Sequence, residues 1–257
     1  MLQARVIPCL QLIGESLVKT VRFGSYSYIG DPVNTVRIFN ELEVDELCFL
    51  DIRASLENRN PNLEILSQIA DECFMPLSYG GGIRDFETAQ KILSIGFEKV
   101  VLNTAAAKNP MLINKIAEHF GSQAVIGSLD VKKNLFGKYQ VHIKDGTEKL
   151  DKSPVEWSRE LQNAGAGEIL LTSMDRDGTW SGYDTELIKS ITQNVNVPVI
   201  ASGGAGSIDD IISAVQDGGA SAAALGSMVV YQAKGMGVLV NFPDKEKLEL
   251  LLSNLRN

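Results

Sequence analysis

The sequence predicts an α/β protein of the (β/α)8 TIM barrel class, and three observations support this prediction. Short apolar runs alternate with amphipathic segments along the chain, which is typical of parallel βα units. Eight such runs can be counted in 257 residues, and this number fits a closed barrel better than an open doubly wound sheet. The two halves of the chain also resemble each other, and no linker divides them. We therefore expect one domain, residues 1–257, built from two similar half-barrels.

The eight expected strands are mostly apolar without strict alternation, as expected of strands that are covered on both faces. They lie at residues 4–11, 46–51, 76–80, 99–103, 124–130, 168–173, 198–202 and 222–226.

Helix starts are marked by capping side chains that precede a proline, because proline suits the first helical position. The four such pairs are Asp31-Pro32, Asn60-Pro61, Asn109-Pro110 and Ser153-Pro154. Ser153 is followed by Glu156 at the spacing of a capping box. Residues 110–120 carry apolar side chains at helical spacing, and Gly121 is placed to end that helix in the left-handed conformation.

The internal repeat has a constant offset of 122 residues. Residues 46–50 read ELCFL where residues 168–172 read EILLT, and PLSYGGGI at 76–83 corresponds to PVIASGGA at 198–205. Two matches in register are unlikely to be coincidence. The repeat pairs the first expected strand with the fifth and the fourth with the eighth.

Composition and charge exclude several classes of protein. The chain has 24 Lys and Arg against 32 Asp and Glu, for a net charge of −8, so a broad nucleic-acid or anionic-membrane surface is not expected. No apolar run approaches the roughly 18 residues that span a bilayer. Cys9, Cys48 and Cys73 show no CxxC spacing, which argues against a disulfide framework or a zinc site. We expect a cytoplasmic protein in which any phosphate recognition is local.

The reactive groups of this barrel class lie where the strands end. Those positions hold Gln11, Asp51, Gly80 to Gly82, Asn103, Thr104, Asp130, Thr172, Ser173, Ser202 to Gly204, Gly226 and Ser227. Two glycine-rich turns, each beside a hydroxyl-bearing neighbour, predict two anion sites for a ligand phosphorylated at both ends. The alternative is that these glycines only make tight βα turns.

Asp130 ends the fifth expected strand, where a carboxylate can act as a general acid or base. The alternative is a capping or loop-ordering aspartate. Its counterpart in the other half is Gln11, whose amide cannot transfer a proton near neutral pH. Asp51 is either a second carboxylate or an orienting group, and a purely structural role is equally open.

Other polar groups have weaker signals. His119 and His142 do not end strands, which argues against a histidine base, a metal site or a Ser/His/Asp triad. Residues 131–149 predict a small hairpin over the site, with Asp145-Gly146 in its turn. The long loop at 12–30 carries Lys19 and is either a mobile lid that brings a cation to a phosphorylated ligand or a merely solvated loop.

Four charged residues begin expected strands at the opposite end of the barrel, and they are Arg5, Glu46, Lys99 and Glu168. Charges of alternating sign at this narrow end can pair into a ring. The residues alone favour a plug of salt bridges over a channel.

Taken together, these features resemble the cyclase subunit of imidazole glycerol phosphate synthase, the HisF family, over nearly the whole chain. The most specific stretches are FLDIRAS (49–55), GGGIRDFETA (80–89), NTAA (103–106), NP and then FGSQAV (109–125), GAGEILLTSMDRDGTWSGYDTE (165–186) and ASGGAG (201–206).

The resemblance implies a bottom face that docks a glutaminase subunit and a gate for ammonia at the ring of four charges. It implies that ammonia is added to a bisphosphorylated ribulosyl intermediate, giving imidazole glycerol phosphate and an aminoimidazole carboxamide ribotide, without metal or cofactor. Asp130 matches a catalytic aspartate, and Lys19, Asp51 and Thr172 are expected in the substrate site. The matched phosphate residues are Gly82, Asn103 and Thr104 in one site, and Asp177, Gly178, Gly204, Gly226 and Ser227 in the other.

Two positions depart from the family pattern. Gln11 stands where the family's first strand carries its other catalytic aspartate, and Thr20 stands where glycine is common. Loss of one general acid or base costs about 10² to 10⁴ in rate, so we do not expect efficient histidine synthesis. Some bacteria carry divergent paralogues that pass ammonia on for sugar amidation in surface polysaccharides, and this is the leading hypothesis. The alternatives are an authentic cyclase that tolerates Gln11 and a barrel that binds a bisphosphate only to signal to its glutaminase.

Overall fold

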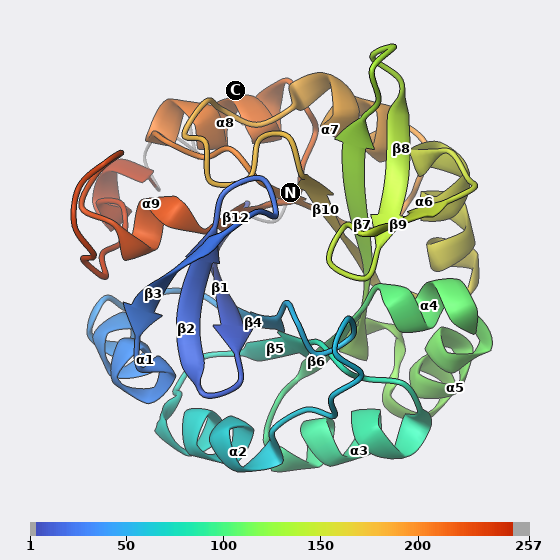
Figure 1. Cartoon of the computed structure of the whole chain (residues 1–257), viewed down its shortest axis with the longest axis horizontal. Coiled ribbons are helices and arrows are strands. Elements are labelled where there is room, and N and C mark those ends of the chain that lie inside the picture. The colour runs from blue at the N-terminus through green and yellow to red at the C-terminus, as the bar shows by residue number, and fades with distance from the viewer. Residues whose placement is uncertain (1–3, 249–257) are drawn as a thin grey trace.

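The computed structural model describes residues 4–248 and confirms the barrel (Figure 1). Eight parallel strands close into a ring in the order β10-β11-β12-β1-β4-β5-β6-β7, and β7 pairs with β10 to complete it. They are β1 (Arg5–Ile13), β4 (Leu47–Asp51), β5 (Leu77–Gly80), β6 (Lys99–Leu102), β7 (Val125–Lys133), β10 (Glu168–Ser173), β11 (Val199–Ser202) and β12 (Ala222–Leu225). Each coincides with an expected strand.

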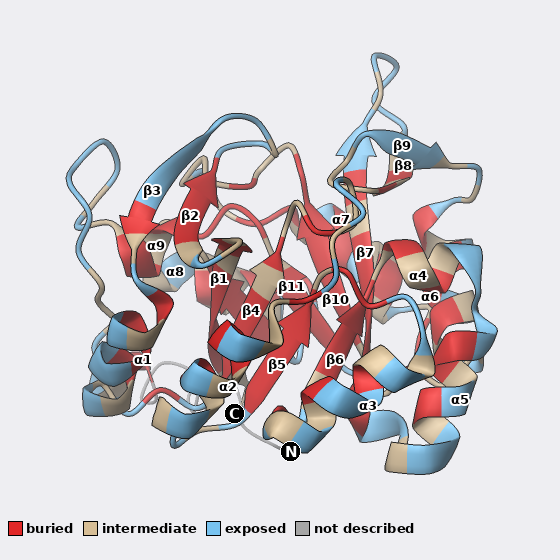
Figure 2. Ribbon diagram, turned by 60° about the horizontal axis from the view of Figure 1, so that its bottom comes forward, coloured by how far each residue is buried: buried red, intermediate tan, exposed pale blue. Residues whose placement is uncertain are grey.

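Helices surround the barrel and turn their apolar faces toward it, so that the strands are buried and the outer helical faces are exposed (Figure 2). In α5, for example, Leu112, Ile113 and Ile116 are buried, as the helical spacing predicts. The helices are α1 (Pro32–Glu41), α2 (Leu63–Glu72), α3 (Phe86–Ile95), α4 (Thr104–Lys108), α5 (Met111–Phe120), α6 (Pro154–Asn163), α7 (Thr185–Thr192), α8 (Ile208–Gln216) and α9 (Ser227–Val230), with a 3-10 turn at Ser122–Ala124.

Two of the four predicted helix starts are confirmed. Asp31 caps α1 by accepting a hydrogen bond from the backbone N–H of Asn34 at 2.7 Å. Ser153 and Glu156 form the predicted capping box of α6. Gly121 ends α5 with a φ of 90°, but its ψ of 151° is not that of a left-handed helical residue.

The other two predicted starts are wrong. Asn60 does not cap α2, because Asn62 lies closer to the helix and its side chain accepts from the N–H groups of Glu64 and Ile65. Asn109 does not cap α5 either, since Pro110 occupies the cap position and makes no side-chain cap bond. An Asn-Pro pair therefore does not predict these two helix starts, because Asn62 caps α2 instead and Pro110 itself occupies the cap position of α5.

Two antiparallel hairpins extend the barrel at its carboxyl end (Figure 2). The predicted loop at 12–30 is wrong as a loop, because it forms β2 (Ser16–Thr20) and β3 (Tyr26–Gly30), with β2 paired to β1. The predicted hairpin at 131–149 is confirmed: β7 runs on to pair with β8 (Tyr139–Ile143), which pairs with β9 (Glu148–Leu150). Backbone pairing of this kind holds both segments over the barrel mouth.

The barrel interior is filled by a separate, smaller apolar cluster. Its smallest side chains, Cys9, Cys48, Ala222 and Ala224, belong to β1 and to its two neighbours β4 and β12. Cys9 and Cys48 are buried free thiols and Cys73 is a half-buried one. Within residues 4–248, no helix combines the length and apolarity needed to cross a membrane.

Candidate active site

A single pocket at the carboxyl ends of the strands brings together all the residues that the sequence places in the catalytic and phosphate sites. They are Gln11, Lys19, Asp51, Gly82, Asn103, Thr104, Asp130, Thr172, Asp177, Gly178, Gly204, Gly226 and Ser227. Residues from every barrel strand or the turn after it line this pocket, because the eight parallel strands all end at the same mouth. Their individual roles stay predictions.

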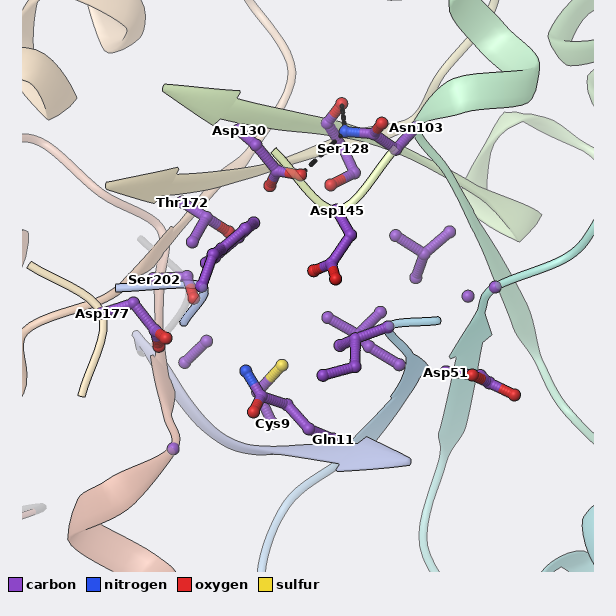
Figure 3. Close-up of a pocket in the computed structure, with 18 of the residues that line it drawn as sticks. Cys9, Gln11, Asp51, Asn103, Ser128, Asp130, Asp145, Thr172, Asp177 and Ser202 are labelled. Carbon is purple, nitrogen blue, oxygen red and sulfur yellow. Dashed lines mark hydrogen bonds between the residues drawn. The ribbon is translucent and has the colours of Figure 1, made fainter. Parts of the chain in front are cut away.

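Asp130 projects from β7 into the pocket (Figure 3), where the side-chain amide of Asn103 donates to its Oδ2 at 3.0 Å. The pKa of Asp130 is raised to about 7: burial is the largest cause, the negative charge of Asp145 adds to it, and a hydrogen bond from Thr172 opposes the rise. A carboxyl group that titrates near neutrality can both give and take a proton. The geometry therefore suits the acid/base alternative better than the capping one.

Gln11 lies on β1 with its amide oriented by Thr20. The backbone N–H of Thr20 donates to the Gln11 Oε1 at 2.8 Å, and the Thr20 hydroxyl lies 3.1 Å from the same oxygen. Because a backbone N–H can only donate, the amide oxygen must face Thr20, and the amide nitrogen is left for the pocket (Figure 3). The two positions that depart from the family pattern are thus hydrogen-bonded to each other.

Lys19 is buried in the pocket wall, which contradicts the alternative of a merely solvated loop, and its role in a lid that brings a cation to a ligand stays a prediction. Only 4% of the residue is exposed. Its ammonium donates to Asp177 Oδ1 at 2.9 Å and to the Thr20 carbonyl at 2.8 Å. A side chain on Gly226 would meet the Lys19 Cε at 2.9 Å, so the lysine stem lies against this glycine. The cation is held beside one of the two predicted phosphate sites.

Asp51 is buried, and both of its carboxylate oxygens accept hydrogen bonds. Arg59 donates to its two carboxylate oxygens at 3.0 and 3.1 Å, and the backbone N–H groups of Arg53 and Ala54 donate at 3.2 and 3.1 Å. This arrangement organises the chain after β4 and supports the structural role for Asp51.

The glycines of the predicted phosphate sites lie where a side chain does not fit. Gly82 has a φ of 69°, and a Cβ there would lie 2.7 Å from the Arg59 carbonyl oxygen. A Cβ on Gly178 would lie 2.6 Å from the Thr20 carbonyl oxygen. Tight turns alone would require glycine at these positions. The structure therefore fits both interpretations, tight turns only and anion binding, and phosphate binding stays a prediction.

The pocket also contains a carboxylate that sequence reasoning treated only as part of a turn. Asp145 follows β8 and lines the pocket. Its Oδ2 lies 3.7 Å from the Nε of Arg53, and burial raises its pKa to about 6. The prediction missed it because it considered only barrel-strand ends, whereas Asp145 reaches the mouth from a hairpin. The Asp-Gly turn after a predicted hairpin over the site was the available signal.

The four charges at the opposite end of the barrel form a closed ring. Arg5 pairs with Glu46 at 2.7 Å and with Glu168 at 3.0 Å. Lys99 pairs with the same two glutamates at 3.0 and 3.4 Å. Each cation therefore bridges both carboxylates, which is the geometry that either a plug or a gate requires.

The histidines lie elsewhere. His119 is exposed and His142 is half-buried, and neither is among the described residues that line the pocket. Across residues 4–248, no three His, Cys, Asp or Glu side chains are grouped in a way that could hold a metal ion.

Comparison with known proteins shows the family to which this chain belongs. The sequence model of the family described as histidine biosynthesis protein matches residues 5–235. A Pseudomonas aeruginosa protein provisionally named imidazole glycerol phosphate synthase subunit hisF2 is 51% identical over 250 residues, covering 97% of this chain and all of that protein. A Vibrio vulnificus protein provisionally named subunit hisF3 is 45% identical over 255 residues, 97% of this chain and 98% of that one. Subunit HisF of Alkaliphilus metalliredigens is 47% identical over 231 residues, 90% of this chain and 92% of that one.

Fold, pocket and family match define a (β/α)8 barrel of the histidine biosynthesis class. Within that class, the chain belongs to the HisF family, the cyclase subunits of imidazole glycerol phosphate synthase. The resemblance drawn from the sequence motifs is confirmed at this level.

Proposed function

We propose that this chain accepts ammonia from a glutaminase subunit bound at the bottom of the barrel and supplies it for amidation of a sugar in surface-polysaccharide biosynthesis. The observation that carries the proposal is a contrast between the two ends of one barrel. The bottom has the complete ring of Arg5, Glu46, Lys99 and Glu168. The top has Gln11 in place of an acid/base group, and its amide is tied to Thr20.

The bottom ring suits a gate because each of its ion pairs can open separately. Both arginine contacts and both lysine contacts share the same two glutamates, so one cation can swing away while the other keeps the carboxylates paired. The names of the relatives describe a subunit, which supports a partner protein. Glu98 is exposed next to Lys99 and offers that partner a charge.

A second candidate is an authentic cyclase that tolerates Gln11. It is favoured by Asp130, because a carboxyl group with a pKa raised to about 7 by burial is still available for proton transfer. The relatives named HisF without qualification are about as similar to this chain as the hisF3 protein, so similarity alone does not separate the two candidates.

The test combines this chain with a glutaminase subunit from the same organism. Calorimetry should detect a complex at micromolar concentration or tighter, and Glu98→Lys should weaken it about tenfold. Glu118→Lys is the matched control, since it makes the same charge change on an exposed residue of α5. The absence of a complex at micromolar concentration would leave the ring as a plug and refute the proposal.

The second arm of the test separates the two candidates. The chain is given ammonium and the histidine-pathway intermediate, and turnover is compared with that of a cyclase that has both aspartates. Turnover at a comparable rate would favour the authentic cyclase and overturn the paralogue proposal. A polysaccharide gene cluster around the gene, rather than a histidine operon, would support amidation.

A further inference from the structure

The turn between β8 and β9 places a carboxylate over the mouth of the barrel. In Figure 3 the side chain of Asp145 points into the middle of the pocket, whereas Asp51 points away toward the rim. The Asp145 side chain is only 12% exposed. No hydrogen bond to its carboxylate is found among the described residues, and its nearest cation, Arg53, is 3.7 Å away. The carboxylate is therefore directed at the space that a ligand would fill.

The turn that carries Asp145 is held on several sides. Lys144, Asp145 and Gly146 have φ angles of 51°, 55° and 75°, a left-handed conformation that costs free energy for the two residues with side chains. The backbone N–H of Lys144 donates to the Thr104 hydroxyl at 3.0 Å, and the His142 Nδ1 lies 3.0 Å from the Gly146 carbonyl oxygen. These contacts fix where the carboxylate stands.

A second carboxylate, that of Asp130 on β7, also projects into this pocket (Figure 3), close enough for the charge of Asp145 to raise its pKa. Burial raises both pKa values, to about 6 for Asp145 and about 7 for Asp130, and the charge of Asp145 is the next largest cause for Asp130. The positive charge of Arg53 lowers the pKa of Asp145, and the negative charge of Glu57 raises it. The negative charge of Asp177 raises the pKa of Asp130. Because both pKa values lie near neutrality, each group can hold or release a proton in this range, and Asp130, with the higher pKa, keeps its proton more readily than Asp145 does.

We propose that Asp145 is the second proton-transferring carboxyl group of this pocket and works with Asp130 in the place that Gln11 cannot fill. The proposal rests on the proposed function only in requiring that ammonia reaches the pocket. Addition of ammonia to a carbonyl group forms a C–N bond as the C=O π bond breaks. The nitrogen then gives one proton to the carboxylate of Asp145, and the oxygen takes one from the carboxylic acid of Asp130. The pair ends with the same single proton on the other partner.

The first test is Asp145→Asn, which keeps the size of the side chain and suits the left-handed turn, with ammonium and the histidine-pathway intermediate as probes. We expect kcat to fall by about 10² or more, while the dissociation constant of the intermediate, measured by calorimetry, changes less than threefold. The pH profile of the residual rate should lose one of its two limbs. Asp145→Gly, which eases the turn, should show the same loss, and Asp151→Asn, on a fully exposed side chain after β9, should show none.

Three results would overturn the proposal. One is an Asp145→Asn variant with the wild-type rate and pH profile. Another is a loss in Asp145→Asn that Asp145→Gly does not share, because the turn and not the carboxyl group would then be responsible. The third is a wild-type chain without turnover of the intermediate. Because the assay supplies ammonium directly, each of these results is distinct from failure of the glutaminase complex, which calorimetry detects separately.

Discussion

The two halves of the barrel use equivalent positions in different ways. The first strand of each half, β1 and β7, runs past the barrel into an antiparallel hairpin. In the first half Gln11 is bonded to Thr20 of its own hairpin, and Lys19 of that hairpin is paired with Asp177. In the second half Asp130 keeps a pKa raised to about 7 by burial, and its hairpin adds Asp145. In the first half the polar groups are thus held by hydrogen bonds, whereas in the second half two carboxyl groups with raised pKa values line the pocket.

If Asp130 and Asp145 transfer protons as proposed, this difference concentrates proton transfer in the second half. In a symmetric site the two acid/base groups would face each other from β1 and β7. Here both carboxyl groups come from the β7 side, and the β1 side offers an amide and a paired ammonium. The predictions that follow change one half at a time.

The largest effect is expected for Asp130→Asn. Removal of the titrating group of the second half should lower ammonium-dependent turnover of the histidine-pathway intermediate by about 10³, because an amide can neither give nor accept a proton near neutral pH. Steady-state kinetics measures the loss. Asp209→Asn, an exposed residue in the first turn of α8, should leave the rate unchanged. An unchanged rate in Asp130→Asn would remove Asp130 from the acid/base role.

Restoring a carboxyl group to the first half should act in the opposite direction. Gln11→Asp should raise the rate about tenfold, and the combination with Thr20→Gly should raise it further. The reason is that the Thr20 hydroxyl, which lies 3.1 Å from the Gln11 oxygen, would help to hold a carboxylate in its charged form, and Thr20→Gly removes this donor while it keeps the backbone N–H. Gln11→Asn is the control, since a shorter amide still transfers no proton. If Gln11→Asn gains as much as Gln11→Asp, side-chain size and not proton transfer limits the rate.

The sequence predicts the barrel well because its evidence is repeated eight times along the chain. It also places Asp130, Gln11 and the glycines correctly at the pocket, since parallel strands end at the same mouth. It fails where a contact depends on tertiary structure. Nothing in residues 12–30 indicates that Lys19 will be buried against Gly226, and nothing in a local turn signal shows that Asp145 lines the same pocket as Asp130.

Asp51 offers a test of whether a strand-end carboxylate serves structure or chemistry. Asp51→Asn should lower the free energy of unfolding by about 2 kcal/mol, less than for a fully buried ion pair because Arg59 is partly exposed. The melting temperature should fall by about 4–8 °C. Glu57→Gln, which removes the more exposed partner of Arg59, should cost about 0.5 kcal/mol or less. A stable Asp51→Asn variant that loses turnover would instead assign Asp51 to the chemistry.

The smallest predicted effect is on stability as a function of pH, and it requires no substrate. The pKa of Asp130 and that of Asp145 are raised by burial to about 7 and about 6, so between pH 4 and 7 these two groups bind more protons in the folded chain than in the unfolded one. Their contribution to the free energy of unfolding should therefore fall as the pH rises through this range. Replacing both residues by asparagine removes the effect. The free energy of unfolding of the variant minus that of the wild type should therefore be about 1 kcal/mol larger at pH 8 than at pH 5. That figure is below the full linkage value because both groups face an open pocket. Urea unfolding of both proteins at the two pH values measures this difference in stability. An equal difference at both pH values would mean that the two carboxyl groups titrate normally. The second half would then be no better suited to proton transfer than the first.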